Sequence, residues 1–442
     1  MNKKLKLTTV LSTVLLMLIT ACSSEDSSSE AGTKDKVTEN GKTILTLSIM
    51  QSTPFYEALE KRFEARYPDI DLRIQAQKEP GAEYEHGEEE EYQRSINTAL
   101  LSGTGPDVFS LEGLSVDDYV EKELILNMDR LLEQEETLQQ DQLHANVLEA
   151  MKQKGGTYTL PLGFNLRAFI GNGEALTDAN IDEESWSWQD FADVAKRLTQ
   201  GDSGLYAMAE YTSDMLMQEM IIDGYSSYVD EGSKTVRFES PEFIALLKQV
   251  QQLYEDGVMT TEAAEPGKQL FYSTVLYEPA DVINQTHILF DQPQLMQKPH
   301  SEAQSGHMRI LPMAQFAIRA DTSVQEEAWK LLSFLLSEEV QQMPEREGFS
   351  MLRSVNDQKL DEVKKQVQAG SYKLPNGQVA QAEDEEFTRF AQLLDLADRY
   401  SMLNARLISI VGEESFAYFS GQMSAEEAAR LIQNRATILL NE

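Results

Sequence analysis

The sequence predicts an α/β protein in which helices cover both faces of a mostly parallel β-sheet. Two observations carry this prediction. From Thr43 onward, short apolar strand patterns alternate with amphipathic helix patterns, and strand–helix–strand units in series favour parallel strands. The 442 residues are 41% hydrophobic and 25% charged, which is typical of globular proteins, and this length suffices for two or three domains.

The elements are expected in the following order. A strand at residues 44–50 is mostly apolar, and a helix follows at 55–67, where Phe55 and Phe63 lie at helical spacing. Pro68 ends that helix. Further strands are expected at 70–75, 108–111, 157–161, 168–170, 205–209, 288–290, 308–311 and 316–318. Further helices are expected at 92–101, 188–198, 241–254 and 324–336, with more helical material in 119–132 and 387–440.

The charge balance and the scarcity of metal-binding side chains exclude several classes of function. Lys and Arg number 38 against 74 Asp and Glu, a net charge of −36, which argues against a protein that binds nucleic acid. The single cysteine excludes a disulfide framework and a cysteine-based zinc site within the chain. The five histidines are scattered, without paired ligand spacing. We therefore expect no metal ion and no cofactor.

The N-terminal residues predict export and attachment to a membrane. Three lysines precede an apolar run at 7–21, which is too short for a comfortable transmembrane helix and fits a signal peptide. The run ends in Ile-Thr-Ala-Cys, which resembles a bacterial lipobox. This predicts that residues 1–21 are removed and that Cys22 carries the lipid, with palmitate-type chains. A plain signal peptide with an incidental cysteine, or an uncleaved anchor, remains the alternative.

Residues 22–42 are expected to form a disordered, lipidated tether, because they contain no aromatic residue and no apolar run. A single acyl chain holds a membrane only marginally, so two or more chains are expected. The protein is therefore expected at the extracellular face of the cell membrane, as in Gram-positive bacteria.

Two acidic segments were weighed as cation sites. Residues 79–91 are expected to form a solvated acidic loop, since runs of like charge are usually exposed, although a cation-collecting loop is conceivable. Residues 178–182 resemble the opening of a calcium loop. However, Glu183 stands where that loop needs glycine, and Gln189 stands where it needs glutamate. Neither segment therefore predicts a metal site.

Several segments, in order along the chain, resemble one family. The helix FYEALEKRFEARYPDI begins at Phe55, LLSGTGPDVF begins at Leu100, and YTLP begins at Tyr158. SWQDF at Ser187 and AWKLLSFL at Ala328 follow, and the last eighteen residues are similar to Gram-positive forms. Together they resemble the family 1 extracellular solute-binding proteins of ABC importers, which include the maltose-binding proteins.

The resemblance implies a two-lobed, periplasmic-binding-protein-like (type II) fold with crossing hinge strands and a cleft between the lobes. Crossings are expected near 160–164, 311–315 and 349–355. Lobe one then combines residues 43–161 with 313–352, and lobe two combines 162–312 with 353–442. The implied function is non-enzymatic: a monomer captures a polar solute, most simply a carbohydrate or oligosaccharide, by hinge closure and delivers it to an ABC permease.

Ligand-binding residues are expected in loops at the carboxyl ends of strands and at the crossings. Polar groups supply fixed hydrogen bonds there, and aromatic rings supply stacking faces. The candidates are Gln51, Ser52, Glu112, Phe164, Asn165, Glu210, Tyr211, Asp291 and Phe349.

The sequence departs from the sugar-binding pattern in places. Gln51 stands where many relatives have tryptophan, and residues 311–316 lack the longer glycine-containing loop. Trp188 and Trp329 are expected in the core, whereas Trp186 is undecided. Peptides and other polar solutes therefore remain possible ligands.

Two rival functions were weighed. A secreted hydrolase is disfavoured, since the sequence lacks GxSxG, HExxH and the GxxxxGK[ST] phosphate loop, and no catalytic residue is predicted. A ligand-sensing lipoprotein that reports to a membrane receptor shares the fold, so the sequence does not separate sensing from import.

Overall fold

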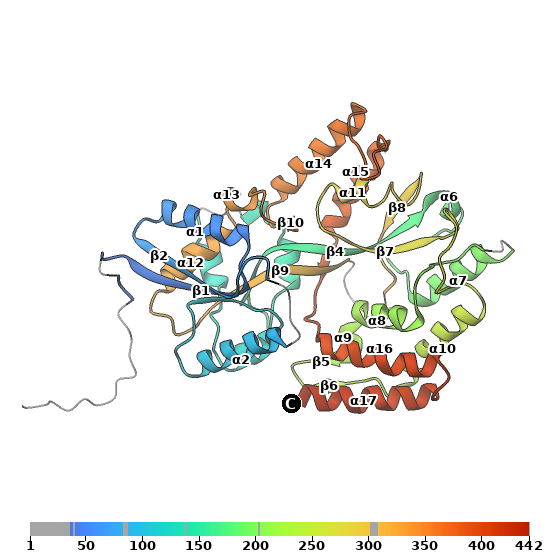
Figure 1. The fold of residues 1–442 in the computed structure, drawn as a ribbon, viewed down its shortest axis with the longest axis horizontal. Helices are drawn as coiled ribbons and strands as arrows, with labels where there is room; N and C mark the ends of the chain where they lie inside the picture. The colour runs from blue at the N-terminus through green and yellow to red at the C-terminus, as the bar shows by residue number, and fades with distance from the viewer. Residues whose placement is uncertain are drawn as a thin grey trace, which may run out of the picture.

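Two α/β lobes lie side by side and are joined by long strands that run through both of them (Figure 1). The computed structural model describes residues 36–38, 40–82, 87–136, 138, 140–201, 204–300 and 308–441. The predicted signal peptide, Cys22 and the tether as far as residue 35 lie outside these residues. No helix in the described ranges is both long and apolar enough to cross a membrane.

Lobe one is built on a sheet with α1 (Pro54–Arg66) on one face and α2 (Glu88–Leu101) on the other (Figure 1). The reason is the alternation of side chains along the first strand, which sends Leu47 and Ile49 toward α1 and Met50 toward α2. The strands of this lobe are β1 (Thr43–Gln51), β2 (Ile70–Lys78) and β3 (Val108–Ser110). Its other helices are α3 (Val116–Glu121), α4 (Asp129–Gln134), α5 (Ala145–Ala150), α12 (Gln325–Leu335) and α13 (Glu338–Gln341), with a 3₁₀ turn at Gln140–Gln142.

Three crossing strands connect the lobes. They are β4 (Leu160–Asn172), β9 (Met308–Ile318) and β10 (Phe349–Ser350). β4 pairs antiparallel with β9 from Leu160 opposite Phe316 to Leu166 opposite Ile310, and β10 lies on the other side of β4. The three predicted crossings therefore lie next to one another in one sheet.

Gly163 makes this close pairing possible. A Cβ atom there would lie 2.6 Å from the carbonyl oxygen of Phe349 and 2.8 Å from a guanidinium nitrogen of Arg346. Both distances are shorter than real Cβ contacts, so a side chain would push β10 away from β4.

The structure corrects the expectation of a mostly parallel sheet. β1 pairs parallel with β2 and β3, but β9 is antiparallel to β3 and to β4, and β10 is antiparallel to β4. The cause is the crossing itself, because a strand that returns from the other lobe enters the sheet in the opposite direction. The expected pairs of short strands at 157–161 with 168–170, and at 308–311 with 316–318, are likewise single long strands. Continuous pairing carries the chain through Pro161 and Pro312.

An aromatic cluster that includes Phe169 of β4 lies in one of the two cores of lobe two. Trp186, Trp188, Phe169, Phe191 and Phe271 contact one another there, and all are at least 92% buried. Its strands are β5 (Val229–Asp230), β6 (Thr235–Val236), β7 (Phe271–Leu276), β8 (Pro293–Met296) and β11 (Ala397–Arg399). Its helices are α6 (Gly173–Leu176), α7 (Trp188–Thr199), α8 (Ser213–Asp223), α9 (Tyr225–Tyr228), α10 (Pro241–Glu255), α11 (Asp281–Asn284), α14 (Arg353–Gln368), α15 (Asp384–Asp395), α16 (Ala405–Phe419) and α17 (Ala425–Asn441).

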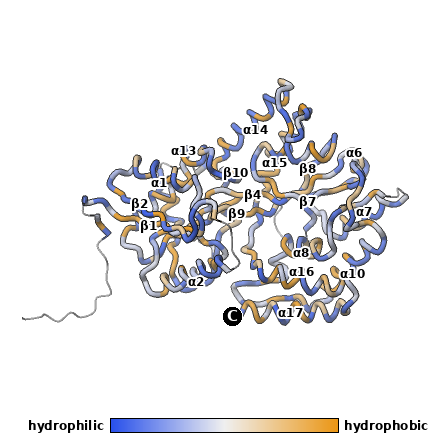
Figure 2. Tube along the Cα trace, in the orientation of Figure 1, coloured by the Kyte–Doolittle hydropathy of each residue, from blue (hydrophilic) through white to orange (hydrophobic). Residues whose placement is uncertain are grey.

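Most expected elements form, and three others besides these merged strands do not form as expected. The strand expected at 205–209 forms only isolated bridges, from Tyr206 to Gln269 and from Met208 to Met259. Residues 288–290 form a turn, in which Ile288 is 47% exposed, because the chain folds back after α11. The helical stretch expected at 119–132 is two short helices, α3 and α4, with a loop between them. The buried positions of Trp188 and Trp329 are confirmed (Figure 2 shows the hydropathy along the chain).

The last residues of the predicted tether contact lobe one. Val37 forms a bridge with Thr43, and the Lys36 ammonium donates to the Asp107 carboxylate at 2.9 Å. Asp107 belongs to the GTGPD segment and also accepts hydrogen bonds from Thr46 and Thr322. This segment therefore has a structural role, because it ties the turn before β3 to both β1 and the N-terminal residues.

Candidate functional site

A cavity of about 750 Å³ is lined by residues of both lobes. Its volume falls in the range of about 300–1,000 Å³ that is usual for small-molecule sites. Both lobes supply its walls. Lobe one contributes Glu89, Glu90, Gln93, Gly113, Ser115, Val116, Asp117, Ala150, Lys152 and Gln153. Lobe two contributes Tyr225, Ser226, Val229, Asp230, Glu231, Gly232, Arg237, Leu439 and residues 400–406.

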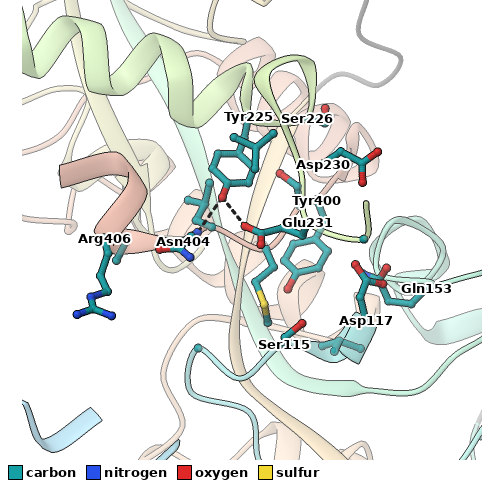
Figure 3. A pocket seen from close by; sticks show the side chains of 18 of the residues that line it. Ser115, Asp117, Gln153, Tyr225, Ser226, Asp230, Glu231, Tyr400, Asn404 and Arg406 are labelled. Carbon is teal, nitrogen blue, oxygen red and sulfur yellow. Dashed lines mark hydrogen bonds between the residues drawn. The ribbon is translucent and has the colours of Figure 1, made fainter. Parts of the chain in front are cut away.

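The lobe-two wall is held by a buried tyrosine. The Tyr225 hydroxyl donates to Glu231 at 2.6 Å and accepts a hydrogen bond from the Asn404 backbone N–H at 3.2 Å (Figure 3). Asn404 also caps α16, since its side chain accepts from the Leu407 N–H. Burial raises the pKa of Tyr225, so its hydroxyl stays a proton donor at neutral pH. These bonds fix the Glu231 carboxylate at the edge of the cavity.

A second tyrosine links this wall to a crossing strand. Tyr400 follows β11, and its hydroxyl donates to Gln315 of β9 at 3.2 Å. The Gln315 carbonyl accepts from Leu111, at the end of β3. Arg309 of β9 donates to the carbonyl and the hydroxyl of Ser401, the residue after Tyr400. The wall that carries Tyr400 is therefore coupled to the strands that connect the lobes.

The cavity is predominantly acidic. Burial raises the pKa of Glu231, and the neighbouring carboxylates of Asp117, Asp118 and Asp230 raise it further. Burial likewise raises the pKa of Glu112, with an added contribution from Glu89. Carboxylates from both lobes therefore lie within electrostatic range of one another.

A buried ion network lies in lobe two, behind the wall of the cavity. Asp223 of α8 is fully buried and accepts from the Arg167 Nε at 2.9 Å. Lys298, 3% exposed, pairs with Glu219 and lies 3.5 Å from Asp223. Glu219 also accepts hydrogen bonds from Tyr211 and Ser273. Burial raises the pKa of Glu219, against the attraction of Arg167, and burial lowers the pKa of Lys298, with a further contribution from the charges of Arg167 and Arg399.

The nine residues singled out from the sequence occupy several different places. All nine belong to the described part of the chain, and none of them lines the cavity. Glu112 lies closest to it along the chain: its carbonyl accepts from Gln93, and Gly113 lines the cavity. Gln51 and Ser52 end β1 beside the Lys78–Ala82 turn, where the Gln51 side chain donates to Ala82.

The remaining six lie in the hinge or in lobe two. Phe164 and Phe349 are fully buried, with their rings 5.5 Å apart, and Asn165 donates to the Met313 sulfur. Glu210 and Asp291 are exposed, and Tyr211 belongs to the ion network. The three hinge residues therefore pack the crossing strands against one another.

Sequence reasoning did not find Tyr225, Tyr400, Glu231 or Asp117. Tyr400 follows the carboxyl end of strand β11, and loops at the carboxyl ends of strands are where ligand-binding residues are expected. That strand is three residues long and lies in a stretch whose pattern is helical, so it was not recognised. Among the described residues, no group of three or more His, Cys, Asp or Glu side chains is arranged to hold a metal ion.

Two lobes, three crossing strands and a solute-sized cavity between the lobes define a two-lobed binding protein. The sequence profile of the bacterial extracellular solute-binding proteins matches residues 48–342. The chain therefore belongs to the family 1 extracellular solute-binding proteins of ABC transporters, the group that includes the maltose-binding proteins. This family binds solutes and does not transform them, so membership confirms the prediction that the protein is not an enzyme.

Solved structures share the fold at low sequence identity. A family 1 extracellular solute-binding protein from Alicyclobacillus acidocaldarius superposes with a TM-score of 0.60 and 18% identity, covering 91% of this chain and 99% of that one. The sugar-binding protein MalE from Xanthomonas citri gives 0.59 and 14%, covering 90% and 98%. A periplasmic oligogalacturonide-binding protein from Yersinia enterocolitica gives 0.59 and 15%, covering 90% and 99%. The two-lobed fold predicted from the sequence is thereby confirmed.

His144, at the hinge, makes stability sensitive to acid. Its ring packs on Phe164 and bonds Asn356 at 3.0 Å, and burial, followed by the charge of Arg353, lowers its pKa to about 4. As the pH falls below roughly 6.5, His144 becomes protonated in the unfolded chain. In the folded chain it stays neutral until the pH reaches about 4. The free energy of unfolding should therefore fall by about 3 kcal/mol across that interval from this residue alone.

The measurement is denaturant unfolding at pH 7 and pH 4.5 for the wild type and for His144→Gln. The variant should lose less stability on acidification than the wild type, whatever its stability at pH 7. Equal losses of stability on acidification in the two proteins would contradict the lowered pKa of His144.

Proposed function

We propose that this protein captures a carbohydrate or oligosaccharide by closing its lobes and delivers it to an ABC permease at the outer face of a membrane. The observation that carries the proposal is the 750 Å³ cavity, whose walls come from both lobes. A solute that touches both walls binds the closed state better than the open state, so it shifts the population toward closure. The permease then has a liganded shape to recognise.

The proposal of a carbohydrate has two supports. The cavity combines hydrogen-bonding side chains with the ring of Tyr400, which suits the polar edges and apolar faces of sugar rings. Two structural relatives carry names that describe sugar or oligogalacturonide binding. Their identities of 14% and 15% leave the particular sugar open.

Thermal melts of the purified protein against mono- and oligosaccharides, peptides and other polar nutrients test this function. A solute at a hundredfold excess over its Kd should add about 2.7 kcal/mol of stability and raise the Tm. A shift with one class of sugar supports the proposal. Shifts with peptides alone would replace the sugar by another solute.

Replacing Tyr400 with alanine should weaken the binding of that sugar about tenfold, since a stacked ring contributes about 1–1.5 kcal/mol. Calorimetric titration measures the change. Tyr400→Phe is the matched control, because it keeps the ring and removes only the hydroxyl that bonds Gln315. If Tyr400→Ala binds as tightly as the wild type, the ring does not contact the ligand.

We further propose that a lipid on Cys22 holds the protein at the membrane. The support is the Ile-Thr-Ala-Cys tetrapeptide directly behind an apolar run. Cells expressing Cys22→Ser should release most of the protein into the medium, whereas wild-type protein should remain with the membrane fraction and take up labelled fatty acid. Retention of the variant at the membrane would favour an uncleaved anchor instead.

A further inference from the structure

Carboxylates from the two lobes line the same cavity. Asp117 of α3 lies on the lobe-one wall, and Asp230 and Glu231 lie on the lobe-two wall (Figure 3). Each lobe's acids perturb those of the other: Asp230 raises the pKa of Asp117, and Asp117 raises that of Glu231, in both cases after the larger effect of burial. The acids on the two walls therefore repel one another, and the Lys154 charge offsets part of this repulsion at Asp117.

Only part of this negative charge is neutralised by the protein itself. Lys152, in the lining, pairs with Glu149 at 2.6 Å, and Lys154, near Asp117, pairs with Glu121 at 2.8 Å. Figure 3 shows the Arg406 side chain extending away from Glu231.

One basic residue in the cavity lining, Arg237, interacts electrostatically with an acidic residue of the lining, Asp230. Arg237 is exposed, and its charge lowers the pKa of Asp230 after the larger effect of the Ser233 hydrogen bonds. The Asp117 carboxylate, by contrast, has no hydrogen-bond or salt-bridge partner within the described part of the chain, and the Glu231 carboxylate accepts only from the Tyr225 hydroxyl there. Asp117 and Glu231 are therefore the two acids, one on each wall, with which a bound cationic ligand could form charge pairs.

Tyr400 adds an aromatic face at the same place. It lines the cavity, and the charge of Asp117 reaches its hydroxyl. A cation over a tyrosine face gains further attraction from the ring, and this attraction strengthens when the site is closed to water.

We propose that the solute carries a protonated amine, which binds between Asp117 and Glu231 beside Tyr400, so that an amino sugar is the natural ligand. This inference rests on the proposed capture of a saccharide in the cleft and specifies its class. The amine contacts an acid on each wall only when the lobes close. Its charge therefore contributes more to the closed state than to the open one, and it removes the repulsion that opposes closure.

The test compares ligands that differ only in charge. Calorimetric titration of the purified full-length protein uses a glucosamine trisaccharide with free amines, its N-acetylated counterpart and a glucose trisaccharide, at low and at high salt. Spermidine supplies ammonium groups without a sugar ring. We expect the amine-bearing trisaccharide to bind at least tenfold more tightly than its N-acetylated form, with the advantage reduced at high salt. Small-angle scattering should show a smaller radius of gyration with the amine form alone.

Two variants complete the test. Glu231→Gln removes the charge but can still accept from Tyr225, and it should lower the affinity for the amine form at least tenfold more than it lowers the affinity for the neutral trisaccharides. Glu385→Gln, on an exposed part of α15 outside the cavity lining, should change neither affinity. The Tm of each variant without ligand shows that it is folded.

The outcomes separate the two proposals. Equal affinity for the charged and neutral trisaccharides, or an unchanged affinity in Glu231→Gln, overturns the inference and leaves carbohydrate capture standing. Tight binding of spermidine without binding of any trisaccharide supports a cationic ligand and overturns carbohydrate capture. Absence of binding by all four probes overturns the inference, whereas a Tm shift with another neutral sugar would still support carbohydrate capture.

Discussion

Asp223→Ala should lower the free energy of unfolding by about 3–5 kcal/mol. The Asp223 carboxylate is fully buried in lobe two and accepts from Arg167 at 2.9 Å, with the Lys298 ammonium 3.5 Å away. Its removal leaves two buried cations that share only Glu219, and a buried charge without a partner costs far more than the pair contributes. Denaturant unfolding followed by tryptophan fluorescence measures the loss, because Trp186 and Trp188 lie in the same lobe.

Asp214→Ala provides the matched control for this prediction. Asp214 lies in the first turn of the same helix, α8, where an aspartate contributes about 0.3–1 kcal/mol through the helix dipole. A loss in Asp223→Ala no larger than in Asp214→Ala would show that the network tolerates the missing charge.

Asp107→Ala should also cost about 3–5 kcal/mol, through a different part of the fold. Asp107 is fully buried in lobe one and accepts from the Lys36 ammonium, from the Thr46 backbone and hydroxyl, and from the Thr322 hydroxyl. Alanine leaves these donors, which are buried or partly buried, without this acceptor. The variant should also free the segment around Lys36, which faster proteolysis at the N-terminus would report.

Asp107 should contribute to acid sensitivity with a defined sign. Burial opposes its ionisation, but the bonds from Lys36, Thr322 and Thr46 outweigh this effect and hold its pKa below the usual value. Its contribution is therefore complete above the unfolded pKa of about 3.9 and is lost as the pH falls through the lower, folded pKa. The stability difference between wild type and Asp107→Asn should shrink over that range.

The control for Asp107→Ala is Asp321→Ala, which removes an exposed partner of Arg319 and should cost less than about 1 kcal/mol.

The elements that sequence analysis predicted well have clear apolar or helix-capping patterns within a few consecutive residues. β1, α1, α7 and α10 each lie within a few residues of their expected bounds. In α7, Ser187 and Asp190 form a reciprocal capping box, and in α10 the residues Ser240 and Pro241 mark the start. Such signals act over three or four residues, so they survive in any tertiary context.

The crossing strands and the site were harder to predict because they depend on distant partners. Pro161 and Gly163 interrupt the apolar pattern of β4, yet the strand continues because β9 and β10 pair on either side of it. The nine candidate residues rest on strand patterns of a few consecutive residues, and the strands expected at 205–209 and 288–290, before Glu210 and Asp291, do not form. Tyr400 follows a three-residue strand whose existence depends on pairing with β9, about ninety positions earlier in the chain.

The sequence by itself determined the α/β class, the family through its ordered motifs, and the expectation of export, because each rests on local spacing or composition. Only the tertiary structure decided which side chains share the cleft. The crossing strands bring Asp117 of lobe one within electrostatic range of Glu231 and Tyr400 of lobe two. No local pattern connects residues so far apart in the chain, since their proximity is set by strand pairing and lobe packing.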